Sequence, residues 1–269
     1  MDNMSKAWEN LYKGMKDIVP ANLVNHPVIK QAIAVSISYD FASHYGSLEG
    51  YVKKLLKNFK EHVWLVPYAN TKAILGEIVT LNKSSEQYIL QLAYLIKSYP
   101  NMDGLNILEI GGGFGGMARI LLSAFPEINS YTLMDFPPML NVAKAFLAGN
   151  PKMKYIETSD AKIEFAQSMP IDLVISNYCL TETTEEFVSA VCEKIFTNRN
   201  VFMIDGGKNA QPIQKIYLDW LYANKDLSIE DYPALAHQNQ KVLTGKIKTK
   251  IAGLDANPNA ESAEEKKGD

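Results

Sequence analysis

Short apolar runs alternate with helical patterns from residue 105 onward. The apolar runs lie at 105–110, 131–134, 154–157, 171–176 and 201–204. Between them, apolar residues recur three or four positions apart at 117–125, 139–147, 187–196 and 213–224. Strands that are apolar along their whole length and alternate with helices are typical of a parallel sheet covered on both faces. The pattern therefore predicts an α/β fold with a doubly wound sheet, and we expect this domain to span residues 101–255.

The first hundred residues carry a different, helical pattern. Apolar side chains recur at helical spacing in 51–59 and again in 89–96. Ser84 and Gln87 have the spacing of a capping box, which predicts that a helix starts at Ser84. We therefore expect a helical N-terminal lobe over residues 1–100, which either closes over a binding site as a lid or serves dimerisation.

The last thirty residues contain a weaker pattern. Residues 241–244 and 246–251 flank Gly245 and are compatible with a terminal antiparallel pair of strands. Residues 256–269 include no large apolar side chain and carry several charges, which predicts a mobile polar tail.

The glycine-rich turn after the first apolar run is the most informative segment. Residues 108–116 read LEIGGGFGG and join a buried strand to a helix. Glycines let the backbone turn sharply and approach a ligand, and the helix beyond offers free N–H groups and a positive dipole end. Because such sheets bind ligands at the carboxyl ends of their strands, we expect a ligand here rather than a tight connection alone.

Two cofactor classes fit the spacing of this turn. Gly111, Gly113 and Gly116 match the dinucleotide pattern, in which the helix N-terminus holds a pyrophosphate. Glu109 followed by Gly111, Gly113 and Gly115 matches the nucleoside motif of methyltransferases that use S-adenosylmethionine. An acid beside a pyrophosphate would repel it, whereas an acid beside the cationic methyl donor is favourable. The turn therefore favours S-adenosylmethionine, and the alternatives are an NAD(P)-dependent oxidoreductase and a non-catalytic nucleoside-binding protein.

Acids after the next two strands extend this pattern. Asp135 follows the second strand, where it would bind ribose hydroxyls or else cap the helix that starts at residue 137. Asp160 follows the third strand, where methyltransferases accept a hydrogen bond from the adenine amino group, although it could equally be an ordinary loop acid. The full set of residues expected at the cofactor is Glu109, Gly111, Gly113, Phe114, Gly115, Asp135, Phe136, Ser159, Asp160 and Asn177.

The segments 108–122 (LEIGGGFGGMARILL), 131–140 (YTLMDFPPML) and 172–182 (DLVISNYCLTE) together resemble a family of bacterial sugar O-methyltransferases. The resemblance covers roughly residues 104–207. It implies a Rossmann-like class I methyltransferase sheet flanked by helices, with S-adenosyl-L-methionine as cofactor. It also implies O-methylation of a sugar, or of a sugar-linked phosphate or phosphoramidate, in capsule or lipopolysaccharide biosynthesis. The expected partner is therefore a small-molecule or glycan-precursor acceptor.

We expect the acceptor site where the fourth strand ends, at the same sheet edge as the donor. An alcohol acceptor needs a base that removes its proton, and the candidates are Glu182, His44 and Asp205. Glu182 could instead stabilise a helix dipole, and a lone histidine is more often a plain surface or core residue. Tyr178, Asp205 and Lys208 are expected to contact the acceptor.

The composition indicates the class of protein and its cellular location, but says little about the reaction. Apolar residues make up 47% of the 269 residues and the net charge is −3, so neither disorder nor nucleic-acid binding is expected. Cys179 and Cys192 offer neither a disulfide framework nor a zinc spacing, which predicts a cytoplasmic protein without a metal site. No apolar run reaches the ~20 residues of a membrane span, and the polar N-terminus predicts no secretory signal. A homodimer is compatible with the sequence.

Overall fold

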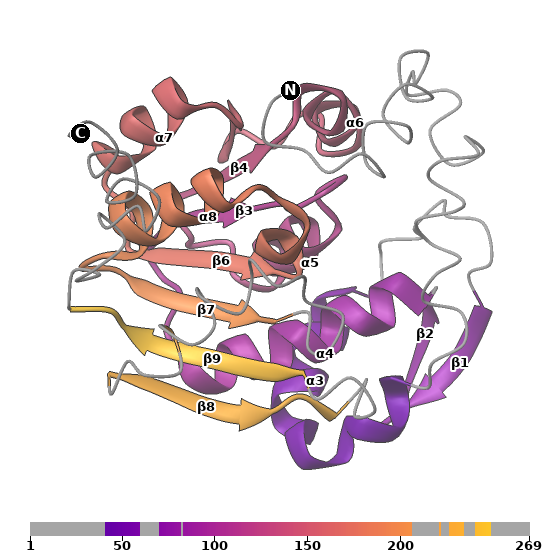
Figure 1. Ribbon diagram of the computed structural model, residues 1–269. Coiled ribbons are helices and arrows are strands. Elements are labelled where there is room, and N and C mark those ends of the chain that lie inside the picture. Colours follow the sequence, from indigo (N-terminus) through magenta and orange to yellow (C-terminus); the bar gives the residue numbers. More distant parts are fainter. Residues whose placement is uncertain are drawn as a thin grey trace, which may run out of the picture.

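The computed structural model describes residues 41–59, 70–81, 83–205, 221, 226–233 and 240–248. Its centre is a seven-stranded sheet with the strand order β5-β4-β3-β6-β7-β9-β8 (Figure 1). The strands are β3 (Asn106–Ile110), β4 (Ser130–Asp135), β5 (Met153–Glu157), β6 (Leu173–Asn177), β7 (Asn200–Ile204), β8 (Leu227–Asp231) and β9 (Lys241–Lys246). Neighbouring strands from β5 to β7 are parallel, whereas β9 is antiparallel to both β7 and β8. The five predicted strands are thus confirmed to within two residues.

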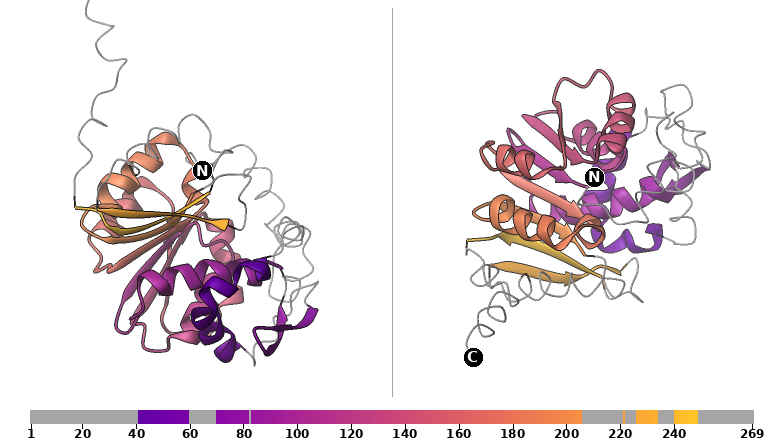
Figure 2. Two further views of the ribbon diagram at one scale, coloured as in Figure 1. Left: turned by 90° about the horizontal axis from the view of Figure 1, so that it is seen from below. Right: turned by 45° about the horizontal axis from the view of Figure 1, so that its top comes forward.

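Helices cover both faces of the sheet, as the alternating pattern predicts (Figure 2). On one face, the core includes side chains from α3 (Glu49–Phe59), α4 (Lys83–Ser98), α5 (Gly116–Ala124) and α6 (Pro137–Phe146). On the other face, it includes side chains from α7 (Asp160–Gln167), α8 (Glu185–Ala190) and the π-helix η5 (Val191–Phe196). The predicted α/β fold with a doubly wound sheet is therefore confirmed.

The far edge of the sheet departs from the dinucleotide-binding arrangement. In that arrangement a sixth parallel strand lies beside the fifth. Here the antiparallel strand β9 lies between β7 and the edge strand β8. The far edge of this sheet therefore differs from the dinucleotide-binding strand order.

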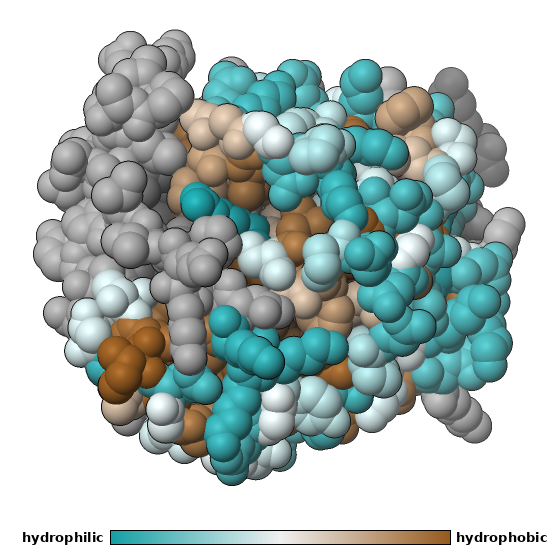
Figure 3. Space-filling view, turned by 180° about the vertical axis from the view of Figure 1, so that it is seen from behind, coloured by the Kyte–Doolittle hydropathy of each residue, from teal (hydrophilic) through white to brown (hydrophobic). Residues whose placement is uncertain are grey.

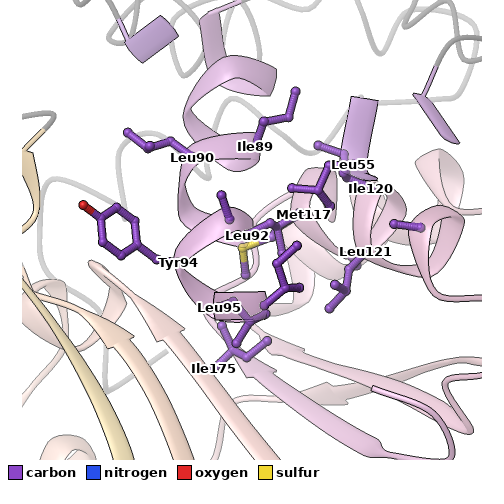
Figure 4. Packing of buried hydrophobic residues seen from close by; sticks show 14 of the residues in the cluster. Leu55, Ile89, Leu90, Leu92, Tyr94, Leu95, Met117, Ile120, Leu121 and Ile175 are labelled. Carbon is purple, nitrogen blue, oxygen red and sulfur yellow. The ribbon is translucent and has the colours of Figure 1, made fainter. Parts of the chain in front are cut away.

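Helix α4 belongs to the core of the sheet. Leu92 and Leu95 of α4 lie in one cluster with Met117 and Leu121 of α5 and Ile175 of β6 (Figure 4). Each of these side chains is at most 2% exposed. Burying an aliphatic side chain of this size contributes about 1.5–3 kcal/mol. The region before residue 100 therefore supplies a structural layer of the sheet, and its service as a lid or dimer contact stays a prediction.

A β-hairpin of β1 (Asn70–Ile74) and β2 (Glu77–Leu81) interrupts the helical N-terminal region and is not predicted by its pattern. Leu75 and Gly76 connect the strands and both have positive φ, +51° and +85°. A two-residue turn of this kind usually carries Asn-Gly, so Leu75 removes the sequence signal. Seen from behind, the molecule shows apolar surface near this hairpin (Figure 3), where Ile78 is 65% exposed.

Several predicted boundaries differ from the structure. Helix α4 begins at Lys83, so Ser84 lies inside the helix instead of capping it. The expected terminal pair of strands is wrong, because β9 is one strand that continues through Gly245. A Cβ atom at Gly245 would lie 2.3 Å from the carbonyl oxygen of Asp226, so the close approach of β8 requires this glycine. The expected helix at 213–224, apart from Leu221, and the tail at 256–269 lie outside the described residues.

Candidate functional site

Four of the five glycines in the turn between β3 and α5 are packed against side chains. A Cβ atom added at any of these four would lie within 2.6 Å of another protein atom. The contacts are Gly111 with Cys179, Gly112 with Glu109, Gly115 with Leu147, and Gly116 with Tyr88. The packing of the protein itself therefore requires these glycines.

Gly113 has a different environment from the other four. Within 4 Å, a Cβ atom at Gly113 would meet one atom of the described chain, Cε of Met139, at an ordinary contact distance of 3.7 Å. Its φ of +58° lies in the left-handed region that favours glycine. The turn is thus open at Gly113, where a ligand could approach the backbone closely.

Three backbone N–H groups of the turn have acceptors within the protein. Gly111 donates to the carbonyl of Met134 at 2.8 Å, and Gly115 donates within the turn at 3.0 Å. Gly113 donates to Oδ2 of Asp135 at 2.9 Å. A pyrophosphate at such a turn depends on N–H groups that are free to bind it. The N–H groups of Gly111, Gly113 and Gly115 are therefore not available to a phosphate in this conformation.

Glu109, at the end of β3, places a buried carboxyl group beneath the turn. Its side chain is 5% exposed, and its Oε2 accepts a hydrogen bond from the hydroxyl of Tyr131 at 2.8 Å. Burial raises the pKa of Glu109 to about 7, with a further upward contribution from Asp135 and an opposing one from the Tyr131 hydrogen bond. No Lys, Arg or His of the described residues forms an ion pair with Glu109. The site thus contains a buried acid without a cationic partner in the described chain.

Asp135, the last residue of β4, lies beside Gly113. It is 6% exposed; Oδ2 accepts from the Gly113 N–H and Oδ1 accepts from the Phe136 N–H at 2.7 Å. Helix α6 follows with Phe136 at its N-cap, and Pro137 and Pro138 in the first turn have no N–H groups to cap. The carboxylate thus faces the turn, and ribose binding by Asp135 stays a prediction.

The remaining residues expected at the cofactor lie along the same edge. The Phe114 ring packs edge-on against Tyr88 of α4, with centroids 6.1 Å apart, and against Phe146 at 5.2 Å. Ser159 precedes α7 in an extended conformation, and Asp160 is the first residue of that helix. The side chain of Asp160 lies outside the described part, so its contact with adenine stays a prediction.

Asn177 and Tyr178, at the end of β6, connect this edge of the sheet to α4. The Asn177 amide donates to Oε1 of Gln91 at 3.3 Å and accepts from the N–H of Ile204 at 3.1 Å. Tyr178 has a φ of +62°, a strained conformation for a bulky residue. Its hydroxyl lies 3.5 Å from Oε1 of Gln240, and the side chains of Gln87, Gln91 and Tyr232 lie near the same hydroxyl. Burial raises the pKa of this hydroxyl, so it is a neutral donor and acceptor at physiological pH.

Two further polar side chains in this region come from the end of the chain and were not predicted. Gln240 precedes β9 and is 3% exposed, and Tyr232 follows β8 and is 1% exposed. The Tyr232 hydroxyl is buried near Tyr178 but has no hydrogen-bond partner of good geometry in the described chain. Together with Gln91, these groups form a neutral polar cluster. A helical face that is apolar except for Gln87 and Gln91, four residues apart, was the available signal for this cluster.

The candidate bases lie in different surroundings. Asp205, 1% exposed, accepts from the Lys241 N–H at 2.9 Å and so joins the end of β7 to the start of β9. His44 ends the short helix η2 (Phe41–His44), which packs against α4, and is half-buried. Glu182 ends the short helix η4 (Cys179–Glu182) after β6, but its side chain is outside the described part. Lys208 lies wholly outside it, so the roles of these residues stay predictions.

Two kinds of feature are absent from the described ranges. No group of three or more His, Cys, Asp or Glu residues there could hold a metal ion. None of the helices described is long and apolar enough to cross a membrane.

Comparisons with known proteins identify structural neighbours only. No protein-family model and no curated protein sequence matches this chain. A solved structure of Haemonchus contortus phosphoethanolamine N-methyltransferase 2 with S-adenosyl-L-methionine is 15% identical over 59% of this chain and 52% of its own, with a TM-score of 0.43. An O-methyltransferase family protein from Burkholderia thailandensis is 12% identical over 61% and 60%, with a TM-score of 0.41. The CurJ carbon methyltransferase is 12% identical over 91% and 70%, with a TM-score of 0.45.

These values are too low to transfer an activity, and the first two matches span little more than half of their own chains. The neighbours are also named for methylation of nitrogen, oxygen and carbon, so they do not agree on an acceptor atom. The chain forms a mixed sheet of seven strands that is flanked by helices, with an antiparallel strand ahead of the last edge strand. The predicted Rossmann-like class I sheet is confirmed on that ground.

Proposed function

We propose that this protein is an S-adenosylmethionine-dependent O-methyltransferase. Its acceptor would be a sugar, or a sugar-linked phosphate or phosphoramidate, of a bacterial surface polysaccharide precursor. The sugar acceptor and a cytoplasmic setting rest on the sequence resemblance and composition described above. The cofactor class rests on the geometry of the turn after β3.

One observation carries the cofactor class: the carboxyl group of Glu109 lies buried beneath the turn without a cationic partner among the described residues. Glu109 and Asp135 are 5% and 6% exposed, and the Gly113 N–H is already bonded to Asp135. An acid at the position of Glu109 would repel a pyrophosphate but favour a ligand with a cationic end, whereas Asp135 could accept from the ribose hydroxyls of either cofactor class. This distinction supports a sulfonium nucleoside over NAD(P).

The residues present fit such a donor. Gly113 leaves the backbone open, Asp135 could accept from ribose hydroxyls, and Glu109 could compensate the cationic end. When bound, the donor would supply a methyl group already activated by sulfonium. The role of the protein is then to align an acceptor oxygen with that methyl group and to exclude water.

The cluster of Gln91, Tyr178, Tyr232 and Gln240 is the proposed acceptor side of the site. Its hydroxyl and amide groups are neutral, and such groups suit the hydroxyls of a sugar. For an alcohol acceptor, His44 or Glu182 would take the proton that leaves as the new carbon–oxygen bond forms. A phosphate oxygen is already ionised and would need no base.

A transfer assay tests this proposal. The full-length protein is incubated with S-adenosylmethionine and a panel of sugars, sugar nucleotides and sugar phosphates, and methylated products are identified by mass. With an alcohol acceptor, His44→Ala or Glu182→Ala should lower turnover by about 100-fold. If both variants keep full turnover at all pH values tested, neither residue is the base. If the protein binds the donor product but methylates no member of any acceptor class, a non-catalytic nucleoside-binding protein replaces the enzyme.

A further inference from the structure

Glu109 occupies an electrostatically unbalanced position. Its carboxyl group accepts one hydrogen bond, from Tyr131, and is otherwise surrounded by apolar or acidic groups. The titratable groups that face it are Tyr131 and Asp135 from β4 and Tyr88 from α4. On the other side, β6 places the apolar Ile175 opposite it. None of these neighbours is a cation.

A buried carboxyl group in such surroundings has two ways to avoid an uncompensated charge. It can keep its proton, or it can ionise when a cation is brought beside it. The first applies to the protein without ligand, in which burial and Asp135 raise the pKa of Glu109 to about 7. The second requires a cation that the described chain does not supply.

We propose that Glu109 exchanges its proton for the cationic amino-acid end of the bound donor. The carboxyl is protonated in a large share of the free protein, and on binding this proton leaves to solvent while the ammonium group of the ligand becomes the counter-charge. Tyr131 is a positioning residue for this exchange, because its hydroxyl stabilises the ionised carboxylate at 2.8 Å. This inference rests on the proposed function and extends it, since it makes donor affinity depend on pH.

Calorimetry with two chemically defined probes tests the exchange. S-adenosylhomocysteine carries the ammonium group, whereas 5′-methylthioadenosine has the same nucleoside without the amino-acid end. Titrations at pH 6.5 in two buffers of different ionisation enthalpy measure the protons released. We expect S-adenosylhomocysteine to release a measurable fraction of a proton that falls as the pH is raised, and methylthioadenosine to release none.

Two variants assign the proton to this carboxyl. Glu109→Gln should bind S-adenosylhomocysteine with no proton release. Tyr131→Phe should shift the pH of half-maximal release upward by about one unit, because the ionised carboxylate loses a hydrogen bond. The matched control is Tyr99→Phe, which removes a hydroxyl that bonds to the Val201 carbonyl at 2.9 Å and does not contact the turn. It should leave the release unchanged.

The outcomes separate this inference from the proposed function. Binding of S-adenosylhomocysteine without proton release overturns the exchange and leaves the cofactor class intact. Equal release from the wild type and Glu109→Gln also overturns it, because another group then supplies the proton. If Glu109→Gln fails to fold, the test uses Tyr131→Phe alone. The exchange is then overturned if the pH of half-maximal proton release is the same in Tyr131→Phe as in the wild type. No binding of S-adenosylhomocysteine at all rejects the proposed function itself.

Discussion

Two turns at the same edge of the sheet, one after β3 and one after β6, are built in opposite ways. The turn after β3 is made of glycines, and its acids come from the ends of β3 and β4. The turn after β6 contains a strained tyrosine, and its polar neighbours come from α4, from the end of β8 and from the start of β9. The first turn is thus assembled from neighbouring strands, whereas the second needs segments from both ends of the described chain.

This difference separates the two halves of the proposed reaction. The donor side has acids and an open glycine, which suit a cationic nucleoside. The acceptor side has neutral hydroxyl and amide groups, which suit a polar acceptor without a fixed charge requirement. Disturbing one side without the other is the way to test whether these are separate sites.

The largest effect is expected from removal of the N-terminal region. A chain starting at residue 101 lacks α4 and so exposes the face of the sheet that Leu92 and Leu95 cover. Several such side chains at about 1.5–3 kcal/mol each outweigh a typical stability of about 5–15 kcal/mol. We therefore expect no cooperative unfolding transition by circular dichroism. A folded truncated chain would show that α4 is a detachable lid.

The next effect concerns the charge on the donor side. The pKa of Glu109 is about 7 in the folded protein, against an ordinary value of 4.5. A raised pKa in a carboxyl means that the contribution of this group to stability is greatest below pH 4.5 and is lost as the pH rises through about 7. The stability of Glu109→Gln relative to the wild type should therefore be greater at pH 8.5 than at pH 5, by on the order of 2 kcal/mol. Urea unfolding at pH 5 and pH 8.5 measures the free energy of unfolding of both proteins. The same difference between variant and wild type at both pH values would contradict the prediction.

Gly113→Val sharpens the comparison at the open glycine. A branched side chain there would occupy the space where the donor approaches, and we expect binding of S-adenosylhomocysteine to fall at least about 100-fold, or 2.7 kcal/mol. Gly149→Val is the matched control, because Gly149 also has a positive φ, +84°, and no atom within 4 Å of an added Cβ. Both variants carry backbone strain of about 1–3 kcal/mol. Equal binding by the two would mean that Gly113 does not face the donor.

The smallest effect is expected at the ribose end. Asp135→Asn removes the charge but keeps the size of the side chain, and affinity for S-adenosylhomocysteine should fall about tenfold. Asp172→Asn is the control, since Asp172 accepts from the Asn106 N–H at the other end of β3. An unchanged dissociation constant in Asp135→Asn would mean that Asp135 only accepts hydrogen bonds from Gly113 and Phe136 and does not bind the donor.

The sequence could predict the donor side because its signals are local. The apolar runs mark the parallel strands, and the turn at 108–116 keeps its acid and glycines within nine residues. Asp135 is the last residue of its strand, so its place at the edge follows from the topology. The contact of Tyr131 with Glu109 was not predicted, because an aromatic residue in an apolar strand is ordinary. The hydrogen bond between them depends on the register of β3 and β4.

The acceptor side could not be predicted in the same way. Gln91, Tyr178 and Gln240 come together only because α4 packs across the sheet and β9 inserts between β7 and β8. The sequence pattern predicted two strands on either side of Gly245, because a glycine in a strand can also indicate a turn. The structure has the single strand β9 there. Without β9 in the sheet, nothing places Gln240 beside Tyr178.

The central claim is that the turn after β3 is built for a cationic nucleoside rather than a dinucleotide. Calorimetry on the full-length protein at pH 8 with S-adenosylhomocysteine, NAD and NADP, at the same concentrations, tests it most directly. The account predicts saturable binding of S-adenosylhomocysteine and no heat of binding from either dinucleotide. Binding of NAD or NADP without binding of S-adenosylhomocysteine would contradict it.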